Sequence, residues 1–477
     1  MQVNDIITSS GIAFGTSGAR GLVEQFRDDV CAAFTVAFLH VMREQGDVSQ
    51  VAIGMDRRPS SPSMAAACTA AAKAMGIEVV DYGVLPTPAL ALKAMADGMP
   101  AIMITGSHIP FDRNGIKFYR PEGEITKVDE QAILNADVAL PPLGAIARNR
   151  ENNAANEYYS KHFTAWFEGK PLAGKRVGLY QHSAAGRDLG QQVLEALGAH
   201  VIPLGRSEQF VPVDTEAVSD EDCAKAAAWA SEHNLDSLLT TDGDGDRPLL
   251  ADENGEWLRG DILGLLCARE LGIQALAVPV SCNTAIEACG AFEQIVRTRI
   301  GSPYVLAGMA SLSEQYDRVA GFEANGGFLL GSQLQKGDHR LSALPTRDAL
   351  LPALTLLVAA AHQNKPLSAL VKGLPSRFTA SDRLKAFPTA LGSALLSQWK
   401  NDLSAMQAAL GFDARIIHVD NTDGVRVTLA TGDIVHLRPS GNAPELRCYA
   451  ESNTPEQAAE LVTNSLSACA RFITSHA

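Results

Sequence analysis

The 477-residue chain has no excess of positive charge, no paired-cysteine motif and no long apolar run. Its net charge of −14 at pH 7 argues against general binding to nucleic acids or to anionic membranes. An anionic substrate would therefore need a local cluster of basic side chains set against the overall negative field.

The eight cysteines form no CxxC pair and have no repeated spacing, which favours free buried thiols in a reducing compartment. Cys68, within the small-residue run 64–70, is typical of the packed side of a helix. The longest apolar run, 349–361, contains Pro352 and is too short to span a bilayer. No basic segment followed by an apolar stretch opens the chain, so no signal peptide is expected. These features predict a soluble cytoplasmic protein.

The chain contains a repeated pattern of short β-branched strands, each followed by small or polar residues and a helix rich in alanine and leucine. Residues 51–56, 176–180 and 275–280 begin three such units. Alternating strands and helices predict mixed, largely parallel sheets covered on both faces. From residue 374 the pattern changes to helices and short strands. The sequence therefore predicts three topologically related α/β domains and a smaller C-terminal α+β domain.

Composition also suggests where the domains divide. Pro141–Gly144 closes the first unit, residues 252–256 resemble a turn near the end of the second, and residues 363–366 precede the change of pattern. A chain of this length is expected to form three or four domains. The predicted domains are 1–145, 146–253, 254–366 and 367–477.

Ser107 lies three residues after the apolar strand 101–104, at the strand-to-loop edge where α/β enzymes place reacting groups. Gly106 would allow the backbone to turn sharply there. A serine hydroxyl becomes a nucleophile when a neighbouring base or a metal activates it. A loop serine that hydrogen-bonds its own backbone is the alternative.

Asp242, Asp244 and Asp246 alternate with glycines, a spacing that can place three carboxylates around one hard cation. Without a cation, these groups would repel one another and raise one another's pKa. An EF-hand is disfavoured because Arg247 stands where that loop needs glycine and because a strand comes before it. A polar surface turn is the other alternative. Arg247 could contact a phosphate oxygen.

Three further clusters contain groups that recognise sugars or phosphates. Glu323 and Asn325, in a glycine-rich loop, could bind adjacent sugar hydroxyls, although the loop alone also fits a structural role. Arg20, between two glycines, could approach a phosphate or belong to a plain turn. A guanidinium, a hydroxyl, an amide and free backbone N–H groups form a candidate phosphate nest at Arg438, Ser440, Gly441 and Asn442.

Taken in order, these segments resemble the α-D-phosphohexomutase superfamily over essentially the whole chain. Residues 105–110 match its phosphoserine loop, 242–247 its metal loop, 321–327 its sugar loop, 438–444 its phosphate loop, and 14–21 its opening motif. Residues 114–117 match its Asn-Gly-x-Lys segment. The sugar loop departs from the family pattern, because Asn325 replaces the usual serine and Gly327 or a neighbouring residue replaces the usual histidine. Ser17 also replaces an aspartate.

The resemblance implies four domains around one central cleft, and phosphoryl exchange between a phosphosugar and a bisphosphosugar on phosphorylated Ser107. It implies Mg²⁺ as cofactor, held by Ser107, Asp242, Asp244 and Asp246, and a hexose 1,6-bisphosphate as activator. It assigns catalysis to Ser107, His108, Lys117, Arg20 and Arg247. It assigns sugar binding to Glu323 and Asn325, and phosphate binding to Arg438, Ser440, Gly441 and Asn442.

The expected function is the interconversion of hexose 1-phosphate and hexose 6-phosphate, with mannose as the first candidate and glucose as the second. A phosphoglucosamine mutase is the alternative within the same class, weakened by the departures at 325–327. A magnesium-dependent sugar phosphatase is the alternative in another class. The intact Ser107 and metal loop argue against a non-catalytic binder. A monomer or homodimer that binds a phosphosugar, and neither nucleic acid nor membrane, is expected.

Overall fold

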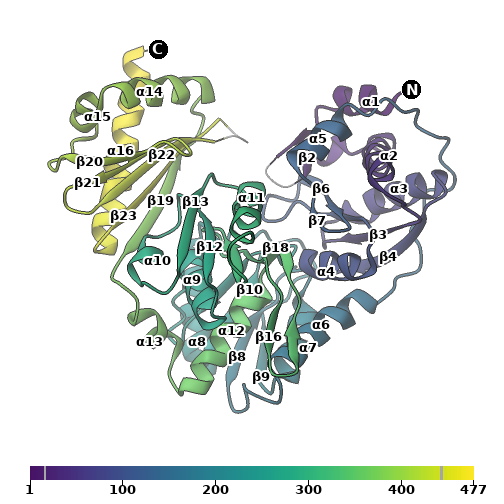
Figure 1. Ribbon diagram of the computed structural model, residues 1–477, viewed down its shortest axis with the longest axis horizontal. Coiled ribbons are helices and arrows are strands. Elements are labelled where there is room, and N and C mark those ends of the chain that lie inside the picture. The colour runs from purple at the N-terminus through teal and green to yellow at the C-terminus, as the bar shows by residue number, and fades with distance from the viewer. Residues whose placement is uncertain (16–17, 441–443, 477) are drawn as a thin grey trace.

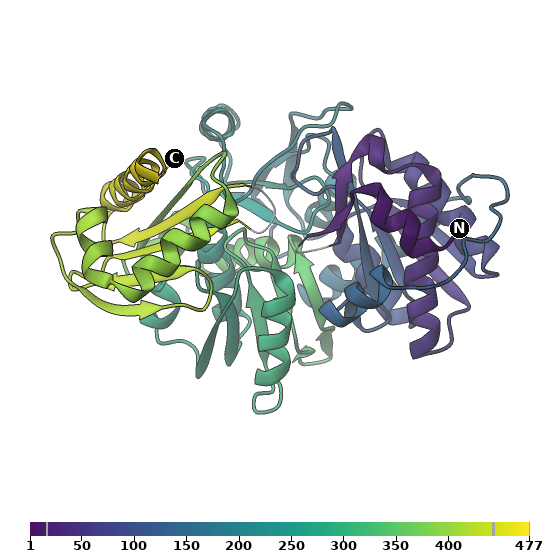
Figure 2. The same ribbon diagram turned by 90° about the horizontal axis from the view of Figure 1, so that it is seen from above.

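The computed structural model describes residues 1–15, 18–440 and 444–476, and the side chains as far as Arg471. Ser17, Gly441 and Asn442, which the sequence assigned to the opening motif and the phosphate nest, lie outside the described residues. Figures 1 and 2 show four units in chain order, with the first and the fourth at opposite ends of the molecule.

The first unit contains a mixed sheet of order β1-β2-β6-β5-β3-β4, with β7 beside β6. Its strands are β1 (Ala13–Phe14), β2 (Ala19–Leu22), β3 (Gln50–Met55), β4 (Glu78–Val84), β5 (Ala101–Ile104), β6 (Arg113–Arg120) and β7 (Gly123–Glu124). Its helices are α1 (Val3–Ser10), η1 (Val23–Gln25), α2 (Asp28–Gln45), α3 (Ser61–Ala74), α4 (Thr87–Asp97) and α5 (Lys127–Leu134).

The second and third units are built in the same way. The second contains β8 (Arg176–Tyr180), β9 (His200–Leu204), β10 (Ser237–Thr241), β11 (Pro248–Ala251), α6 (Ala154–Trp166), α7 (Arg187–Ala196) and α8 (Asp220–His233). The third contains β12 (Ala275–Pro279), β13 (Gln294–Thr298), β14 (Val319–Phe322), β15 (Phe328–Leu330), β16 (Leu334–Lys336), β17 (His339–Leu341), β18 (Leu344–Asp348), α9 (Gly260–Glu270), α10 (Ala285–Ala288), α11 (Ser302–Leu312), α12 (Leu350–Gln363) and α13 (Leu367–Lys372).

The fourth unit has a wholly antiparallel sheet of order β19-β23-β22-β21-β20. Its elements are β19 (Phe378–Leu384), β20 (Ile416–Asp420), β21 (Val425–Leu429), β22 (Ile434–Pro439), β23 (Leu446–Ser452), α14 (Thr389–Asn401), α15 (Leu403–Leu410) and α16 (Pro455–His476). The predicted C-terminal α+β domain is therefore confirmed.

One strand motif recurs in the first three units. Strand orders β4-β3-β5-β6, β9-β8-β10-β11 and β13-β12-β14-β15 each contain three parallel strands followed by one antiparallel strand. The loop from the third strand to the antiparallel fourth carries Ser107 in the first unit, the three aspartates in the second and Glu323 in the third. Since these loops leave the carboxyl end of a parallel strand, the motif presents polar side chains where α/β folds bind ligands.

Helices cover both faces of each repeated sheet, as the sequence predicted. In the first unit, α2 and α3 bury one face in a core that contains Phe34, Phe38 and Phe118, whereas α4 lies on the other face. The core under α4 continues through α6, α7, α9 and α12, so the first three units share one apolar interior. The fourth unit has its own core.

Two details differ from or extend the sequence prediction. The helix expected after the strand at 275–280 is only one turn long, because Gly290, with φ of 63°, stops it shortly after Cys289. All eight cysteines are free thiols, and Cys68 is buried on α3.

Among the described residues, no helix combines the length and apolar character needed to cross a membrane.

Candidate active site

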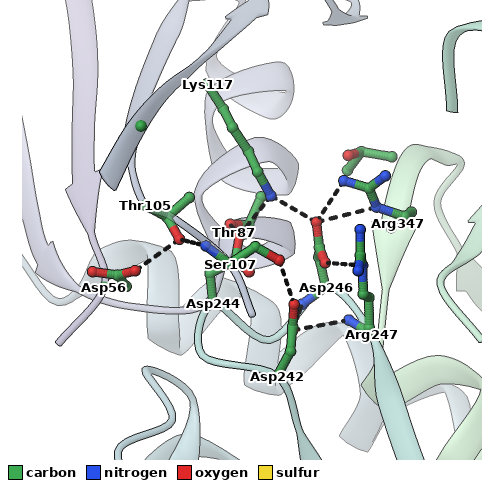
Figure 3. Close-up of polar contacts among 12 residues, drawn as sticks. Asp56, Thr87, Thr105, Ser107, Lys117, Asp242, Asp244, Asp246, Arg247 and Arg347 are labelled. Atoms are coloured by element: carbon green, nitrogen blue, oxygen red, sulfur yellow. Dashed lines mark hydrogen bonds and ion pairs between the residues drawn. The ribbon is translucent and has the colours of Figure 1, made fainter. Parts of the chain in front are cut away.

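Ser107 lies in the loop after β5 and is completely buried. Its Oγ donates a hydrogen bond to Asp242 Oδ2 at 2.6 Å, and its backbone N–H donates to Thr105 Oγ1 at 2.8 Å (Figure 3). Its φ of 55° lies in the left-handed region that residues with a Cβ rarely adopt. The loop therefore holds the serine hydroxyl directly against the aspartate loop of the second unit.

Arg58, which the sequence analysis did not single out, holds this loop in place through hydrogen bonds to its backbone carbonyls. Its Nη2 donates to the Ser107 carbonyl at 2.9 Å, its Nη1 to the Pro110 carbonyl at 2.7 Å, and its Nε to Asp56 Oδ2 at 3.1 Å. A Cβ at Gly106 would come within 2.6 to 2.8 Å of the same guanidinium, so only glycine fits there. Two arginines directly after β3 were the available signal in the sequence.

Asp242, Asp244 and Asp246 converge in the loop between β10 and β11. Each offers one carboxylate oxygen within 4.8 Å of the others, and all three side chains are buried. Gly245, with φ of 71°, makes the turn that brings them together. Thr87 Oγ1, at the start of α4, donates to Asp244 Oδ2 at 2.6 Å and joins this loop to the first unit.

The charges in this cluster are unevenly balanced. Burial raises the pKa of Asp242 well above its usual value, and the neighbouring Asp244 and Asp246 raise it further. Burial also opposes ionisation of Asp246, but Arg347, Lys117 and Arg247 outweigh it and hold the pKa of Asp246 well below its usual value. The basic side chains therefore neutralise Asp246, whereas the negative charge of Asp242 is not fully balanced by nearby positive charge.

The cluster fits a hard divalent cation such as Mg²⁺. Its ligand atoms are all oxygens, and Asp244 Oδ1 and Asp246 Oδ1 are buried without a hydrogen-bond partner among the described residues. Buried acceptors that have no donor are rare in native proteins unless an ion or a water satisfies them. A cation held here would also supply the charge that Asp242 lacks.

Lys117, on β6, points from the first unit into this cluster. Its Nζ donates to Asp244 Oδ2 at 2.6 Å and to Asp246 Oδ2 at 2.7 Å (Figure 3). Burial by itself would lower the pKa of Lys117, but the two carboxylates outweigh it and the pKa is raised. Lys117 is therefore an ammonium group that can donate a proton.

His108 is held neutral beside Ser107. Burial, with the charges of Arg247 and Arg20, lowers the pKa of His108 to about 2. Because Arg247 Nη1 lies 2.8 Å from His108 Nδ1 and can only donate, this nitrogen is the acceptor and the proton lies on Nε2. His108 Nδ1 is therefore already engaged and is not placed to accept a proton from the serine, 3.4 Å away.

Arg20, on β2, brings a further guanidinium close to the same group. Burial, together with the nearby charges of Arg247 and Arg347, lowers the pKa of Arg20 to about 10, so the group stays charged at neutral pH. Within the described part of the chain, its guanidinium forms no hydrogen bond or ion pair. Arg20 is therefore available to an anionic ligand.

Arg347, on β18, is the second group that the sequence analysis missed. Its Nε and Nη2 lie 3.1 and 2.8 Å from Asp246 Oδ2 (Figure 3). Its Nη1 donates to Glu323 Oε2 at 2.9 Å. It thus connects the loop of Glu323 to the aspartate loop. The available signal was a polar run, residues 346–348, that ends a buried strand just before the apolar helix α12.

The two predicted sugar-binding residues differ in their surroundings. Glu323 reaches the aspartate cluster through Arg347. Asn325 is occupied by its own loop, because its Oδ1 accepts from the Gly327 N–H at 3.0 Å and its backbone carbonyl accepts from Thr215 Oγ1 at 3.0 Å. The amide nitrogen of Asn325 forms no hydrogen bond with a described residue and is available to a ligand.

The described part of the predicted phosphate nest lies in the fourth unit, with Arg438 near the end of β22 and Ser440 directly after that strand. Arg438 Nε is 2.9 Å from Asp423 Oδ2, and the buried Ser440 donates its N–H to the Glu445 carbonyl at 2.8 Å. Within the described ranges, Arg438 forms no hydrogen bond or ion pair with the group around Ser107. The nest is therefore a separate cluster on another domain.

Comparisons with known proteins agree with this architecture. The four phosphoglucomutase/phosphomannomutase domain models match in chain order, namely alpha/beta/alpha domain I at residues 11–138, domain II at 157–255, domain III at 259–378 and the C-terminal domain at 396–465. A putative phosphomannomutase structure from Thermus thermophilus has a TM-score of 0.76 at 22% identity, covering 97% of this chain and 99% of that one.

Sequence relatives match over nearly the same length. A phosphomannomutase of Salmonella muenchen is 52% identical over 466 residues, which is 97% of this chain and 96% of the relative. A phosphomannomutase of Sinorhizobium fredii is 44% identical over 466 residues, 96% of this chain and 98% of the relative. With its domains matched in order and relatives this similar, the chain belongs to the phosphoglucomutase/phosphomannomutase family.

Proposed function

We propose that this chain is a phosphohexomutase that interconverts the 1- and 6-phosphates of mannose, and of glucose as a second substrate. The observation that carries the proposal is the 2.6 Å hydrogen bond from Ser107 Oγ to Asp242, beside a buried carboxylate cluster that suits a divalent cation. The two relatives at 52% and 44% identity, both phosphomannomutases, favour mannose as the sugar.

The proposed cation site uses Asp242, Asp244 and Asp246, with Ser107 as the fourth ligand. When bound there, Mg²⁺ would supply the positive charge that phosphoryl transfer requires. Arg20 and Arg247 add guanidinium groups that can bind the non-bridging phosphate oxygens. The group around Ser107 therefore combines a hydroxyl with several cations, as transfer of a charged phosphoryl group demands.

Phosphorylation of Ser107 by a hexose bisphosphate begins with its Oγ attacking phosphorus. The Oγ–P bond forms, the bond from phosphorus to the sugar oxygen breaks, and the serine proton passes to Asp242 Oδ2, which already accepts it in a hydrogen bond. The departing sugar oxygen takes a proton from the Lys117 ammonium group. In the reverse direction a sugar hydroxyl attacks the phosphoserine, and both protons return.

A mutase must accept its bisphosphate intermediate in two orientations, so that either phosphate can face Ser107. We assign the distant phosphate to Arg438 and Ser440 with Gly441 and Asn442, and the sugar hydroxyls to Glu323 and Asn325. Hexose 1,6-bisphosphate would then serve as both activator and intermediate. We propose a cytoplasmic monomer or homodimer with domain divisions near residues 145, 253 and 366.

The direct test compares mannose 1-phosphate, glucose 1-phosphate and glucosamine 1-phosphate, with Mg²⁺ and the matching bisphosphate present. Each reaction is followed for 6-phosphate product and for inorganic phosphate. Fastest isomerisation of mannose 1-phosphate supports the proposal, and fastest isomerisation of glucosamine 1-phosphate would replace it with the alternative mutase. Phosphate release without isomerisation would indicate a phosphatase.

A further inference from the structure

Gly327 ends the loop of Glu323, and space rather than backbone conformation accounts for the glycine there. A Cβ at this position would lie 2.6 Å from Arg347 Cδ and 2.7 Å from Arg347 Cγ, whereas the φ of Gly327 lies outside the left-handed region. The stem of Arg347 therefore fills the space that a side chain at position 327 would occupy.

Strand pairing explains how Arg347 reaches this place. Arg347 lies on β18, which pairs with β15 in the register Phe328 to Asp348, and Gly327 directly precedes β15, so the two residues lie close together. The Arg347 side chain is only 3% exposed and contacts the carboxylates of Glu323 and Asp246 at 2.8 to 3.1 Å. One buried guanidinium thus joins the sugar loop to the aspartate loop.

The guanidinium also determines how Glu323 can meet a ligand. Glu323 Oε2 accepts from Arg347, whereas no described residue donates a hydrogen bond to Glu323 Oε1. The planar guanidinium holds Asp246 Oδ2 with Nε and Nη2 while it donates to Glu323 Oε2 with Nη1, and the single ammonium of a lysine lacks this rigid arrangement of donors. Glu323 is therefore presented with one oxygen fixed and one open.

We propose that Arg347 is a positioning residue for sugar recognition, and that Gly327 is the small residue that makes room for it. By orienting Glu323 against Asp246, Arg347 sets the distance between the sugar hydroxyl that Glu323 Oε1 binds and the phosphoryl group at Ser107. Misplacement of such a group by about 1 Å is enough to weaken recognition and transfer strongly. This inference rests on the proposed function, because it assumes a phosphosugar ligand.

The test measures binding without turnover. In a Ser107→Ala background, titration calorimetry gives the Kd of mannose 1-phosphate and of glucose 1-phosphate for Arg347→Lys, Glu323→Gln and the double variant. Arg347→Lys keeps the charge and loses the fork, so the ratio of the two Kd values should change by about tenfold. Once Glu323 is glutamine, Arg347→Lys should change the ratio no further.

Arg340→Lys, in an exposed hairpin of the same domain, is the matched control and should keep the original ratio. Arg347→Gln is a second variant in case the lysine protein does not fold. An unchanged ratio in Arg347→Lys, or an equal change with and without Glu323, overturns the inference. If neither sugar phosphate binds, both proposals are overturned. If both bind but the wild-type protein, which retains Ser107, does not isomerise them, only the proposed function is overturned.

Discussion

Ser107 has a left-handed backbone conformation, which favours glycine, although the proposed function requires a side-chain hydroxyl at this position. A side chain with a Cβ costs about 1 kcal/mol in this region relative to glycine. The hydrogen bond to Asp242 requires the hydroxyl nevertheless. Strain of this kind is typical of sites where function outweighs stability.

Ser107→Ala and Ser107→Gly should both lose nearly all mutase activity, since neither retains the hydroxyl. The glycine variant should nevertheless be more stable than the alanine variant by about 1 kcal/mol, because glycine tolerates the φ of 55°. Chemical denaturation measures the stability difference, and the mutase assay measures the loss of activity.

Ala386→Gly, at the exposed Ala386 with φ of 56°, is the control and should gain stability without losing activity. Normal activity in Ser107→Ala would reject the nucleophile.

The residues that the sequence could predict at the site are those that are continuous along the chain. The spacing of the aspartates at 242, 244 and 246 was enough to indicate a candidate cation site. Arg58 and Arg347 could not be found in this way, because their partners lie 49 and 101 residues away in Ser107 and Asp246. Such contacts depend on how strands pair and how domains pack, which no local pattern records.

At the scale of elements, Asp348 connects β18 to α12 and to α6. Its Oδ1 accepts from the Tyr159 hydroxyl at 2.6 Å and from the Leu350 N–H at 2.8 Å, where α12 begins. Burial raises the pKa of Asp348 from 3.8 to about 6, although both hydrogen bonds favour the ionised form. Ionised Asp348 therefore costs stability at neutral pH.

The folded protein binds the Asp348 proton more tightly than the unfolded chain, so this group lowers stability as pH rises from 3.8 to about 6. Asp348→Asn keeps the accepting oxygen and removes the charge. Relative to wild type, it should gain up to about 3 kcal/mol at pH 7, and this gain should vanish near pH 4. The Tm values of the variant and the wild type, compared between pH 4 and pH 7, test this prediction. Asp338→Asn, in an exposed hairpin, is the control, and a gain independent of pH would contradict the assignment.

Element positions were largely predictable, and the differences have physical causes. The strand at 176–180 was predicted with its observed limits, as β8. The strand expected before the aspartate loop runs from Ser237 to Thr241, because its pairing with β8 begins with Ser237 opposite Val177. Strand limits are set by the partner strand, which the segment's own sequence does not contain.

At the scale of the molecule, Glu124 joins the first unit to the third. Its Oε2 accepts from Ser302 Oγ at 2.8 Å, where α11 begins, and its Oε1 accepts from Thr346 Oγ1 at 2.7 Å on β18. Both hydroxyl groups belong to buried residues. One carboxylate therefore connects β7 to two elements of another domain, next to Arg347.

Glu124→Ala should leave two buried hydroxyls without their acceptor, at a cost of about 1 to 3 kcal/mol for each group that finds no replacement. We expect a lower Tm and faster amide hydrogen exchange at the start of α11. Glu122→Ala, two residues away and exposed, is the control and should change neither. Equal effects of the two substitutions would show that the contact does not stabilise the domain arrangement.

The sequence repeat correctly predicted three related α/β domains and a different fourth one. It did not predict that the first three share an interior through α4, α6, α7, α9 and α12, while the fourth has a separate core. The reason is that an alanine- and leucine-rich helix is apolar on more than one face, so its sequence does not say which domain it will contact. The distribution of the site over three repeated loops follows from the topology.

The central claim is that Ser107 accepts and releases a phosphoryl group beside the aspartate cluster. The most direct measurement incubates the protein with Mg²⁺ and mannose 1,6-bisphosphate, followed by intact-mass and peptide mass spectrometry. We predict a gain of one phosphoryl group, located on Ser107, that disappears on addition of mannose 1-phosphate and does not form in Ser107→Ala. An unmodified Ser107, or an equal gain in Ser107→Ala, would contradict the account.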